Sequence, residues 1–542
     1  MNKCLLLFAL LFSCIFSFAQ NKKFTFKLGA EYELPKRAND LGFYGSQSEG
    51  IVNLFLKKKE LNIFSFNAKT LSQSGEKEIP LDITANHNNE GVVNFENNFF
   101  WLHSDWDKSA KEESLYFDKI DVKTGTMTET NKKLFSSTKI AGEYGGGGFS
   151  MFGGFGGPGS YSGKTVGKYD LNYDANNTRL LVSYRLVPEE RNDKKNYDKI
   201  GLYVFDQKMN KIWNNEFTMP YTEAIMDNLD FTVDAQGNAY MLAKVYESEK
   251  RKEKDKETGK PGYHFEVLKF NAEKKLQQYA VSLDDFFIRE ASLIENSVHD
   301  IVLSCTYSKK SKGTGTDGVF LAMLDQNGKV VKYKNGYYEF PVAELEKFEK
   351  ARTRRKIEKK DDYEAPNLKV RNIDVEKDGS VFLALEEYHY TVSTSTYNNH
   401  TTTTYTYYYD DILGAKIDAQ GNFLWLRKIP KKQRGTNSFQ TLGYKMISDE
   451  TGYYFLYLDN KKNVDLEEDE APKYHENGYG GQVMVAKIDN QGNVSKELLF
   501  DTREEEVMVM PRFFKRIDGN HYIGRTSIRG PGAYRPLLIS VN

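Results

Sequence analysis

Two stretches of the sequence repeat nearly the same phrase, Ala415-Lys416-Ile417-Asp418-Ala419-Gln420-Gly421-Asn422 and Ala486-Lys487-Ile488-Asp489-Asn490-Gln491-Gly492-Asn493. Each begins as an alternating apolar strand and then changes to residues that favour a turn. The Asp side chain accepts hydrogen bonds from the backbone that follows it, and Gly tolerates the positive φ that closes the turn. The phrase therefore predicts a tight connection between two antiparallel strands.

Looser copies of this phrase occur along the whole chain, with the turn-starting residue at Asn67, Asp121, Asp206, Asn271 and Asp325. A second strand-turn-strand pattern precedes each copy, as in residues 231–242 and 373–383. Each repeat thus predicts four antiparallel strands. Four-stranded repeats at unequal intervals are typical of propeller blades that carry insertions. The predicted fold is all-β, a closed β-propeller of four-stranded antiparallel blades, with eight blades and seven as the alternative.

The two ends of the chain are predicted to form one blade together. Residues 512–523 predict a hairpin and residues 536–541 a third strand, after which the sequence stops. The fourth strand of this last blade is supplied by Phe24-Thr25-Phe26-Lys27-Leu28, which precedes the first repeat. Such pairing leaves no open sheet edge, so we expect a ring sealed by the N-terminal strand. Residues 20–542 then form a single domain.

The composition excludes one class of partner. The 542 residues include 75 Lys and Arg against 76 Asp and Glu, so no single sign of charge dominates. A protein without a basic excess lacks the electrostatic signature of nucleic-acid binding, and we expect no nucleic-acid partner.

The first residues predict export. Lys3 precedes an apolar run, and Ser17-Phe18-Ala19 offers small residues at the positions that signal peptidase reads, so residues 1–19 are interpreted as a cleavable signal peptide. Lipidation at Cys14 is the alternative. The apolar run is short for a membrane span, and no later stretch is apolar enough to make one. Cleavage leaves Cys305 as the only thiol, in an apolar strand pattern that indicates a buried, inert side chain.

The expected insertions fall on one face of the ring. The first-to-second and third-to-fourth strand turns of each blade share a face and are all short. The other connections carry the insertions 141–166, 186–199, 247–263, 341–367, 388–411 and 459–482. Loops on a rigid scaffold are where binding residues concentrate, so we expect any partner on the insertion face.

One insertion is rich in Gly interleaved with large apolar residues, over residues 142–163. Its candidate partner-binding residues are Tyr144, Phe149, Met151, Phe152, Phe155 and Tyr161. Such side chains on a Gly-rich tether suit the cavity or pore of another protein, and a loop without a partner is the alternative. Gly154, Gly156 and Gly159 match a dinucleotide motif, but no strand precedes them and no helix follows, so no cofactor is expected.

Three other insertions have recognisable patterns. Residues 341–360 predict one helix, with Glu344, Glu346 and Glu349 early and Arg and Lys late, and with Leu345 and Phe348 facing the ring. Residues 391–409, rich in Thr and Tyr, predict a protruding hairpin; a glycan-binding role for its Tyr faces is the alternative. Residues 465–470 form an acidic run that we interpret as a solvated loop.

The sequence carries no recognisable catalytic, cofactor or metal motif. The eight His residues have no metal-ligand spacing, and residues 159–163 place Tyr161 where a nucleophilic Ser would stand. Asp170, Asn172 and Asp174 resemble the start of a calcium loop, but Ala175 and Leu181 stand at its required Gly and Glu positions, which favours a strand turn. The sequence thus favours a non-catalytic protein. A hydrolase with carboxylates meeting in the central channel stays open.

The signal ending in Phe18-Ala19-Gln20, together with the turns at 416–422 and 487–493, resembles the exported β-propeller proteins of Gram-negative bacteria that use the type IX secretion system. That resemblance implies a periplasmic protein associated with the outer membrane, a monomer within a hetero-complex. Its implied partner is the outer-membrane translocon barrel, whose periplasmic mouth the insertion face would close as a plug. A glycan- or peptide-binding propeller is the alternative.

Overall fold

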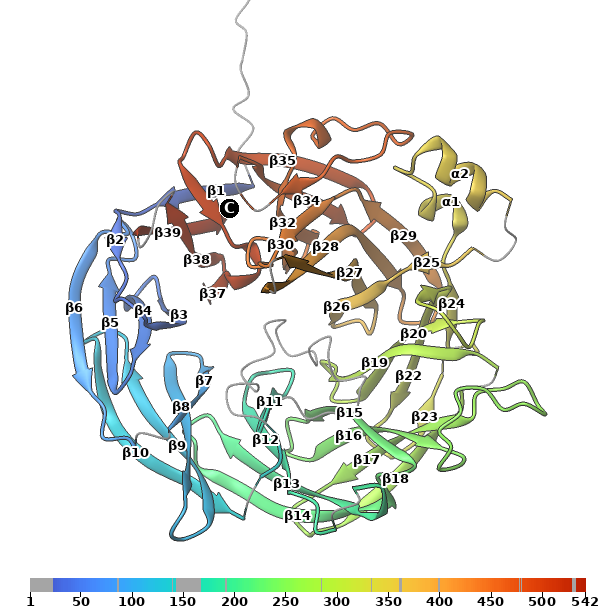
Figure 1. Cartoon of the computed structure of the whole chain (residues 1–542), viewed down its shortest axis with the longest axis horizontal. Coiled ribbons are helices and arrows are strands. Elements are labelled where there is room, and N and C mark those ends of the chain that lie inside the picture. Colours follow the sequence, from blue (N-terminus) through green and yellow to red (C-terminus); the bar gives the residue numbers. More distant parts are fainter. Residues whose placement is uncertain are drawn as a thin grey trace, which may run out of the picture.

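Eight mainly antiparallel sheets follow one another around a ring, and in the first seven the first strand lies nearest the middle (Figure 1). This computed structural model describes residues 23–542 except 85–86, 139, 143–166, 191–192, 284, 333, 360–362, 398–399, 477, 479 and 529–532. The chain is therefore a β-propeller with eight blades, as the repeats predict.

The first four blades each contain four strands in sequence order. Blade 1 has β3 (Asn39–Ser46), β4 (Gly50–Lys57), β5 (Glu60–Phe66) and β6 (Gln73–Pro80); blade 2 has β7 (Asn88–Phe95), β8 (Asn98–Asp107), β9 (Glu112–Asp121) and β10 (Thr126–Ser137). Blade 3 has β11 (Asp170–Tyr173), β12 (Arg179–Arg185), β13 (Tyr197–Asp206) and β14 (Lys211–Thr222); blade 4 has β15 (Met226–Val233), β16 (Ala239–Tyr246), β17 (Tyr263–Phe270) and β18 (Leu276–Val281).

Blades 5 and 6 carry additional short strands, whereas blade 7 has four strands. Blade 5 has β19 (Phe287–Glu295), β20 (Ile301–Ser308), β22 (Gly318–Leu324) and β23 (Val330–Val331), with β24 (Tyr337–Glu339) also on β22. Blade 6 has β26 (Leu368–Val375), β27 (Val381–Tyr397), β28 (His400–Ile417) and β29 (Phe423–Ile429), extended by β30 (Gln433–Thr436) and β33 (His475–Glu476). Blade 7 has β31 (Tyr444–Asp449), β32 (Gly452–Asp459), β34 (Gln482–Asp489) and β35 (Val494–Asp501); β21 (Gly315–Thr316) pairs with β25 (Ala365–Pro366).

The eighth blade joins the two ends of the chain. It contains β36 (Val507–Val509), β37 (Lys515–Asp518), β38 (His521–Ile528) and β39 (Ala533–Val541), and its outer strand is β1 (Phe24–Leu28). β1 runs antiparallel to β39 with Phe24 opposite Val541, and β2 (Tyr32–Glu33) pairs further along β39. The prediction that the N-terminal strand supplies the missing strand is confirmed (Figure 1).

Short helices occur only between strands in the described part of the chain. They are η2 (Asp193–Lys195), α1 (Val342–Leu345), α2 (Ala351–Ile357), η3 (Lys461–Asn463) and η4 (Pro511–Phe513). The single helix predicted over 341–360 is wrong: α1 and α2 are separate, and Phe348 between them has a φ of 60°. A residue in that left-handed region interrupts a right-handed helix.

Burial changes across each blade. All of β16, a second strand, is buried, whereas nearly all of β6, a fourth strand on the rim, is exposed. Second strands therefore read as continuous apolar runs, because neighbouring blades cover both of their faces.

The hydrophobic core is divided among the interfaces between blades. Eight clusters of buried apolar side chains are present among the described residues, one for each pair of neighbouring blades. One of them joins Phe43 and Phe64 of blade 1 to Ile523 and Leu538 of blade 8. Burying one such large apolar side chain contributes about 1.5–3 kcal/mol. The ring is therefore closed by packing at every interface as well as by β1.

Candidate functional site: the insertion face at blades 6 and 7

The two faces of the ring are built differently. One face, called here the short-turn face, carries turns such as 234–238 between β15 and β16 and 418–422 between β28 and β29. The opposite insertion face carries the β16 to β17 and β32 to β34 connections and the hairpin formed by the ends of β27 and β28. The insertion face is thus the one that offers irregular side-chain arrangements.

The short-turn face repeats one local device. Asp418 Oδ1 accepts hydrogen bonds from the backbone N–H of Gln420 and Asn422, and its Oδ2 accepts one from Asn422 Nδ2. The turn that starts at Asp489 has the same bonds. The repeated phrase of the sequence is therefore a structural turn signal and carries no chemistry of its own.

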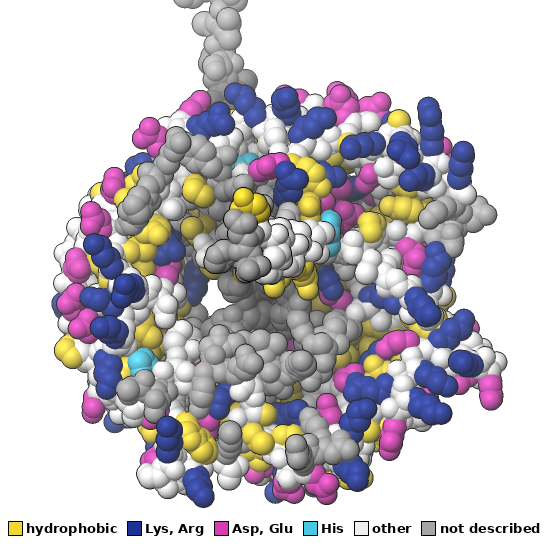
Figure 2. All heavy atoms as spheres, in the orientation of Figure 1, with side chains coloured by type: hydrophobic (Ala, Val, Ile, Leu, Met, Phe, Trp, Pro, Cys, Tyr) yellow, Lys and Arg dark blue, Asp and Glu magenta, His cyan; other side chains and the backbone are white. Residues whose placement is uncertain are grey.

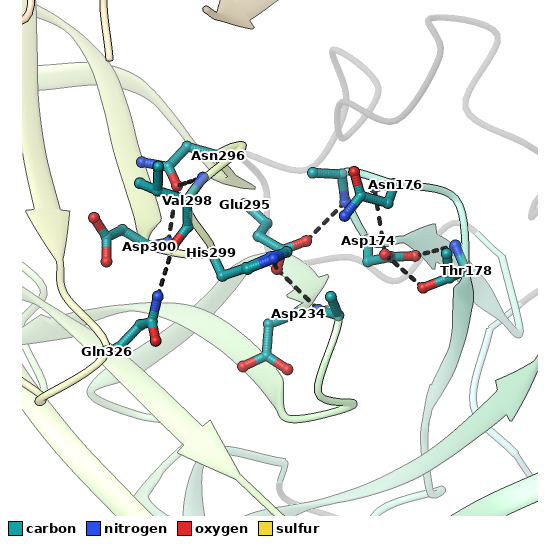
Figure 3. A network of polar contacts seen from close by, with 12 residues as sticks. Asp174, Asn176, Thr178, Asp234, Glu295, Asn296, Val298, His299, Asp300 and Gln326 are labelled. Carbon is teal, nitrogen blue, oxygen red and sulfur yellow. Dashed lines mark hydrogen bonds and ion pairs between the residues drawn. The ribbon is translucent and has the colours of Figure 1, made fainter. Parts of the chain in front are cut away.

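A carboxylate on the same face holds three blades together (Figure 3). Glu295, at the end of β19, accepts the backbone N–H of Ala175 from blade 3 and that of Ala235 from blade 4, both at 2.8 Å. His299 Nδ1 lies 2.8 Å from the same carboxylate. Burial raises the pKa of Glu295. No sequence motif predicts this residue, because its partners are far away along the chain.

The calcium-like stretch near Asp174 is a turn, as its departures from the calcium pattern predict. Asp174 accepts the backbone N–H groups of Thr178 and Arg179 (Figure 3). Its oxygens are thereby used within the β11 to β12 turn. Among the described residues, no group of three or more His, Cys, Asp or Glu could hold a metal ion.

The predicted hairpin is the largest feature of the insertion face. β27 and β28 remain paired in register from Tyr388 opposite Tyr409 to Tyr397 opposite His400. Their ends lie near the middle of the ring (Figure 1). The prediction of a protruding hairpin over 391–409 is confirmed.

The hairpin exposes aromatic and apolar side chains. Tyr390 is 55% exposed, Val392 51%, Tyr405 42% and Tyr397 79%. The ring of Tyr390 lies 6.2 Å from that of Tyr407, and Tyr407 in turn contacts Phe439 at 5.2 Å between ring centroids. Exposed aromatic side chains on a rigid strand pair are well suited to contact another molecule, since they bury much area at little entropic cost.

A buried charged cluster anchors the hairpin, named here the hairpin-base cluster (Arg371, Glu386, Tyr409, Lys431 and Arg512). Glu386 accepts hydrogen bonds from Arg371 Nε at 3.0 Å and from Lys431 Nζ at 2.9 Å. Lys431 Nζ also donates to the Tyr409 carbonyl at 2.8 Å. Arg512, which follows blade 7, donates to Tyr409 Oη at 3.2 Å and to the Phe439 carbonyl at 2.7 Å. Blades 6 and 8 thereby fix the direction in which the hairpin leaves the ring.

Carboxyl groups beside this cluster have altered protonation. Burial raises the pKa of Asp410 to about 7 and that of Asp459 to about 7. Burial also lowers the pKa of His475 to about 4, so this imidazole is neutral at pH 7. Perturbed groups gather at functional sites, but buried structural networks perturb pKa values too. Asp459 accepts a hydrogen bond from Asn463 Nδ2 at 2.7 Å and so belongs to such a buried network.

The helical insertion and the acidic run lie together. Lys347 pairs with Glu468 at 2.9 Å, and the Phe348 N–H donates to the Glu468 carbonyl at 2.7 Å. Leu345 is buried against blades 5 and 6, as predicted, and Lys428 of β29 contacts Glu349 at 3.0 Å. Lys and Arg side chains gather over α1 and α2 (Figure 2). In the sequence, the basic end of residues 341–360 and the acidic run of residues 465–470 are far apart. Only their opposite charges could have indicated that they make contact.

Two predictions fall outside the described residues: the signal peptide predicted for residues 1–19, and the residues predicted to bind a partner, Tyr144, Phe149, Met151, Phe152, Phe155 and Tyr161. Cys305 is buried, and burial raises the pKa of its thiol well above the ordinary value. The expectation of a buried thiol is confirmed. Within the described chain, no helix is long and apolar enough to cross a membrane.

Comparison with known proteins identifies no family for this chain, and the similar solved structures share little sequence with it. No protein-family model and no curated protein matches the chain. The β-propeller domain of the Trilobed protease from Pyrococcus furiosus is 11% identical, over 86% of this chain and 97% of its own, with a TM-score of 0.32. The WD40 domain of SCAP from fission yeast is 8% identical over 96% and 95%, with a TM-score of 0.35. A quinohemoprotein alcohol dehydrogenase from Pseudomonas putida HK5 is 10% identical over 95% and 76%, with a TM-score of 0.38.

Proposed function

We propose that this β-propeller is an exported, non-catalytic protein that docks through its insertion face onto an outer-membrane protein partner. In the finer form of the proposal, the partner is the type IX secretion translocon barrel, and the propeller closes its periplasmic mouth. The observation that carries the docking function is the hairpin of β27 and β28, which projects exposed Tyr390, Val392 and Tyr405 from a rigid base.

The rigid base is what makes this face suitable for docking. The hairpin-base cluster buries its charges and bonds them to one another, so the hairpin is already in one orientation before a partner arrives. A surface that needs no ordering on binding loses less conformational entropy. Lys347 pairs with Glu468, and Arg354 of α2 donates to the Asp469 carbonyl. These contacts between the helical insertion and residues 465–470 add a polar rim beside the aromatic hairpin.

The test is purification of the tagged protein from its native envelope in mild detergent. Recovery of a very large outer-membrane barrel in near-equal amount would support the proposal, and absence of any such barrel would contradict it.

Deletion of residues 142–163 tests the role of this loop as a plug: cells should become permeable to bulky antibiotics while the ring keeps its melting temperature. Unchanged permeability would leave docking in place and contradict the role of that loop as a stopper.

Glycan binding is the second candidate, and the exposed rings of Tyr390, Tyr397 and Tyr405 are the observation that favours it. Flat aromatic faces stack on sugar rings by the same contacts that serve protein partners. Titration with glycans, followed by Tyr fluorescence, separates the two functions. Saturable quenching that is lost in Tyr390→Ala would favour the glycan.

A further inference from the structure

The outer half of β27 forms a sheet edge without a neighbouring strand. β26 pairs with β27 only between Leu368, opposite Glu387, and Val375, opposite Val381. From Tyr388 to Tyr397, β27 pairs with β28 alone within the described part of the chain. The outer half of β27 is thus an open edge, on the side where β26 pairs with the inner half.

The hydrogen bonds at the base of the hairpin show which backbone groups face this edge. Tyr388 N–H points away from β28, since it donates to the Asn367 carbonyl at 3.0 Å. Backbone groups alternate along a strand, so the N–H and C=O of residues 390, 392, 394 and 396 point the same way. Within the described residues these groups have no hydrogen-bond partner.

The opposite edge of the hairpin is covered at its base. β30 pairs with β28 from Thr406 to Tyr409. Beyond β30, the Asn437 side chain accepts the Tyr405 N–H at 2.9 Å, and the Asn437 N–H donates to the Tyr405 carbonyl at 2.8 Å. The two edges of one hairpin therefore differ, and the β27 edge is the more open.

The side chains do not protect the open edge. Natural proteins guard exposed edges with Lys, Pro or other charged residues. Residues 388–409 contain no Lys, Arg, Asp, Glu or Pro, although 28% of the chain is charged. They are mainly Thr and Tyr, which favour strands. An unprotected edge of this composition is suited to pair with a further strand.

We propose that the open edge of β27 receives an extended, uncharged segment of the docked partner protein as an additional β-strand. This rests on the proposed docking function and specifies how the partner binds. The segment is uncharged because its alternate side chains lie beside Tyr390 and Val392, where residues 388–409 offer no opposite charge. Backbone hydrogen bonds to residues 390, 392, 394 and 396 supply the affinity.

A pair of proline variants tests the edge without breaking the hairpin. Thr394 lies directly opposite Thr403, and the backbone N–H of each points out of the hairpin, on opposite edges. Thr394→Pro removes a donor from the open edge only, and Thr403→Pro is the matched control. Neither change removes a hydrogen bond between β27 and β28. Equal melting temperatures of the two variants would show that the hairpin is retained.

The first measurement titrates the protein into a labelled, capped peptide of alternating Thr and Val and follows binding by fluorescence anisotropy. We expect Thr394→Pro to weaken binding by about tenfold or more, and Thr403→Pro to change it by less than about twofold. Equal weakening by the two variants, or no binding to the wild type, would overturn the proposal.

The second measurement separates strand addition from docking. In the envelope purification, loss of the barrel with Thr394→Pro but not with Thr403→Pro supports strand addition. Equal recovery with both overturns strand addition and leaves docking intact. Edge-dependent peptide binding without any barrel supports the edge and contradicts the docking function. A wild-type dimer in sedimentation that becomes a monomer in Thr394→Pro would assign the edge to a second copy of the chain, and would overturn the proposal.

Discussion

The short-turn face and the insertion face use polar residues in opposite ways. On the short-turn face, the carboxylates of Asp418 and Asp489 accept hydrogen bonds from the turns that follow them, although Glu295 links blades on this face as well. On the insertion face, the hairpin-base cluster joins residues from blades 6 and 8. The first arrangement stabilises a repeat, and the second anchors β27 and β28, the longest strands of the described chain. The proposal of docking through the insertion face rests on that asymmetry.

The largest effect is expected in the hairpin-base cluster. Glu386→Ala leaves the buried cations of Arg371 and Lys431 without their shared carboxylate, and breaking such a buried pair costs about 3–5 kcal/mol of unfolding free energy. Chemical denaturation measures the loss. Removal of Glu476, which pairs with Arg434 on the exposed surface, is the control and should cost about 0–1 kcal/mol. Equal losses of unfolding free energy would show that the hairpin-base cluster stabilises the fold no more than an exposed ion pair does.

The next effect depends on pH and concerns Glu90, near the insertion-face end of β7. Burial raises its pKa from the ordinary 4.5 to about 7, so the folded protein favours the protonated carboxyl. The wild type should therefore lose stability as pH rises from about 4.5 to about 7, and no further above that. Glu90→Gln removes this loss.

The variant should match the wild type at pH 4 and exceed it by about 3 kcal/mol at pH 8, since each pKa unit corresponds to about 1.4 kcal/mol. Denaturation of both proteins at the two pH values provides the measurement. A difference that is the same at both would mean that Glu90 does not titrate as the burial requires.

On the short-turn face, Glu295 should matter more than any single turn. Glu295→Ala deprives two backbone N–H groups, in blades 3 and 4, of their acceptor, and an expected loss of about 2 kcal/mol follows. Glu295→Gln keeps an acceptor oxygen and should lose less. Thermal unfolding distinguishes the two. An unchanged melting temperature for Glu295→Ala would show that Glu295 does not hold the blades together.

The smallest effect is expected in a single turn. Asp418→Ala removes hydrogen bonds that lie largely in water, so we expect a loss of about 1 kcal/mol. Asp489→Ala, in the matching turn of the next blade, should lose nearly the same amount. Denaturation curves that differ strongly between the two would show that the turns are not equivalent units.

The sequence predicts the parts of this fold that depend on near neighbours. The turns after Asp418 and Asp489, the closing strand at Phe24 and the hairpin over 391–409 all follow from local patterns or from counting strands. The break at Phe348 could not be predicted in the same way, because a contact with Glu468 accompanies it.

The candidate site is less predictable than the ring for the same reason. Glu386 and Lys431 are distant in sequence, and so are Glu295 and Ala175, so no spacing brings them together. The Tyr-rich hairpin could be placed on the insertion face from its pattern, but its open edge depends on where β26 and β30 end. The partner-binding role of Tyr144, Phe149 and their neighbours in that loop stays a prediction.

Shortening the hairpin is the sharpest test of docking through the insertion face. Thr391 lies opposite Thr406, so an Asn-Gly turn in place of residues 392–405 should reconnect the strands without disturbing the ring. The control carries Gln420→Lys and Gln491→Lys, two exposed changes on the short-turn face. In envelope purifications, the shortened protein should lose the outer-membrane barrel while the control keeps it. Recovery of the barrel with the shortened protein, or its loss from the control, would contradict the account.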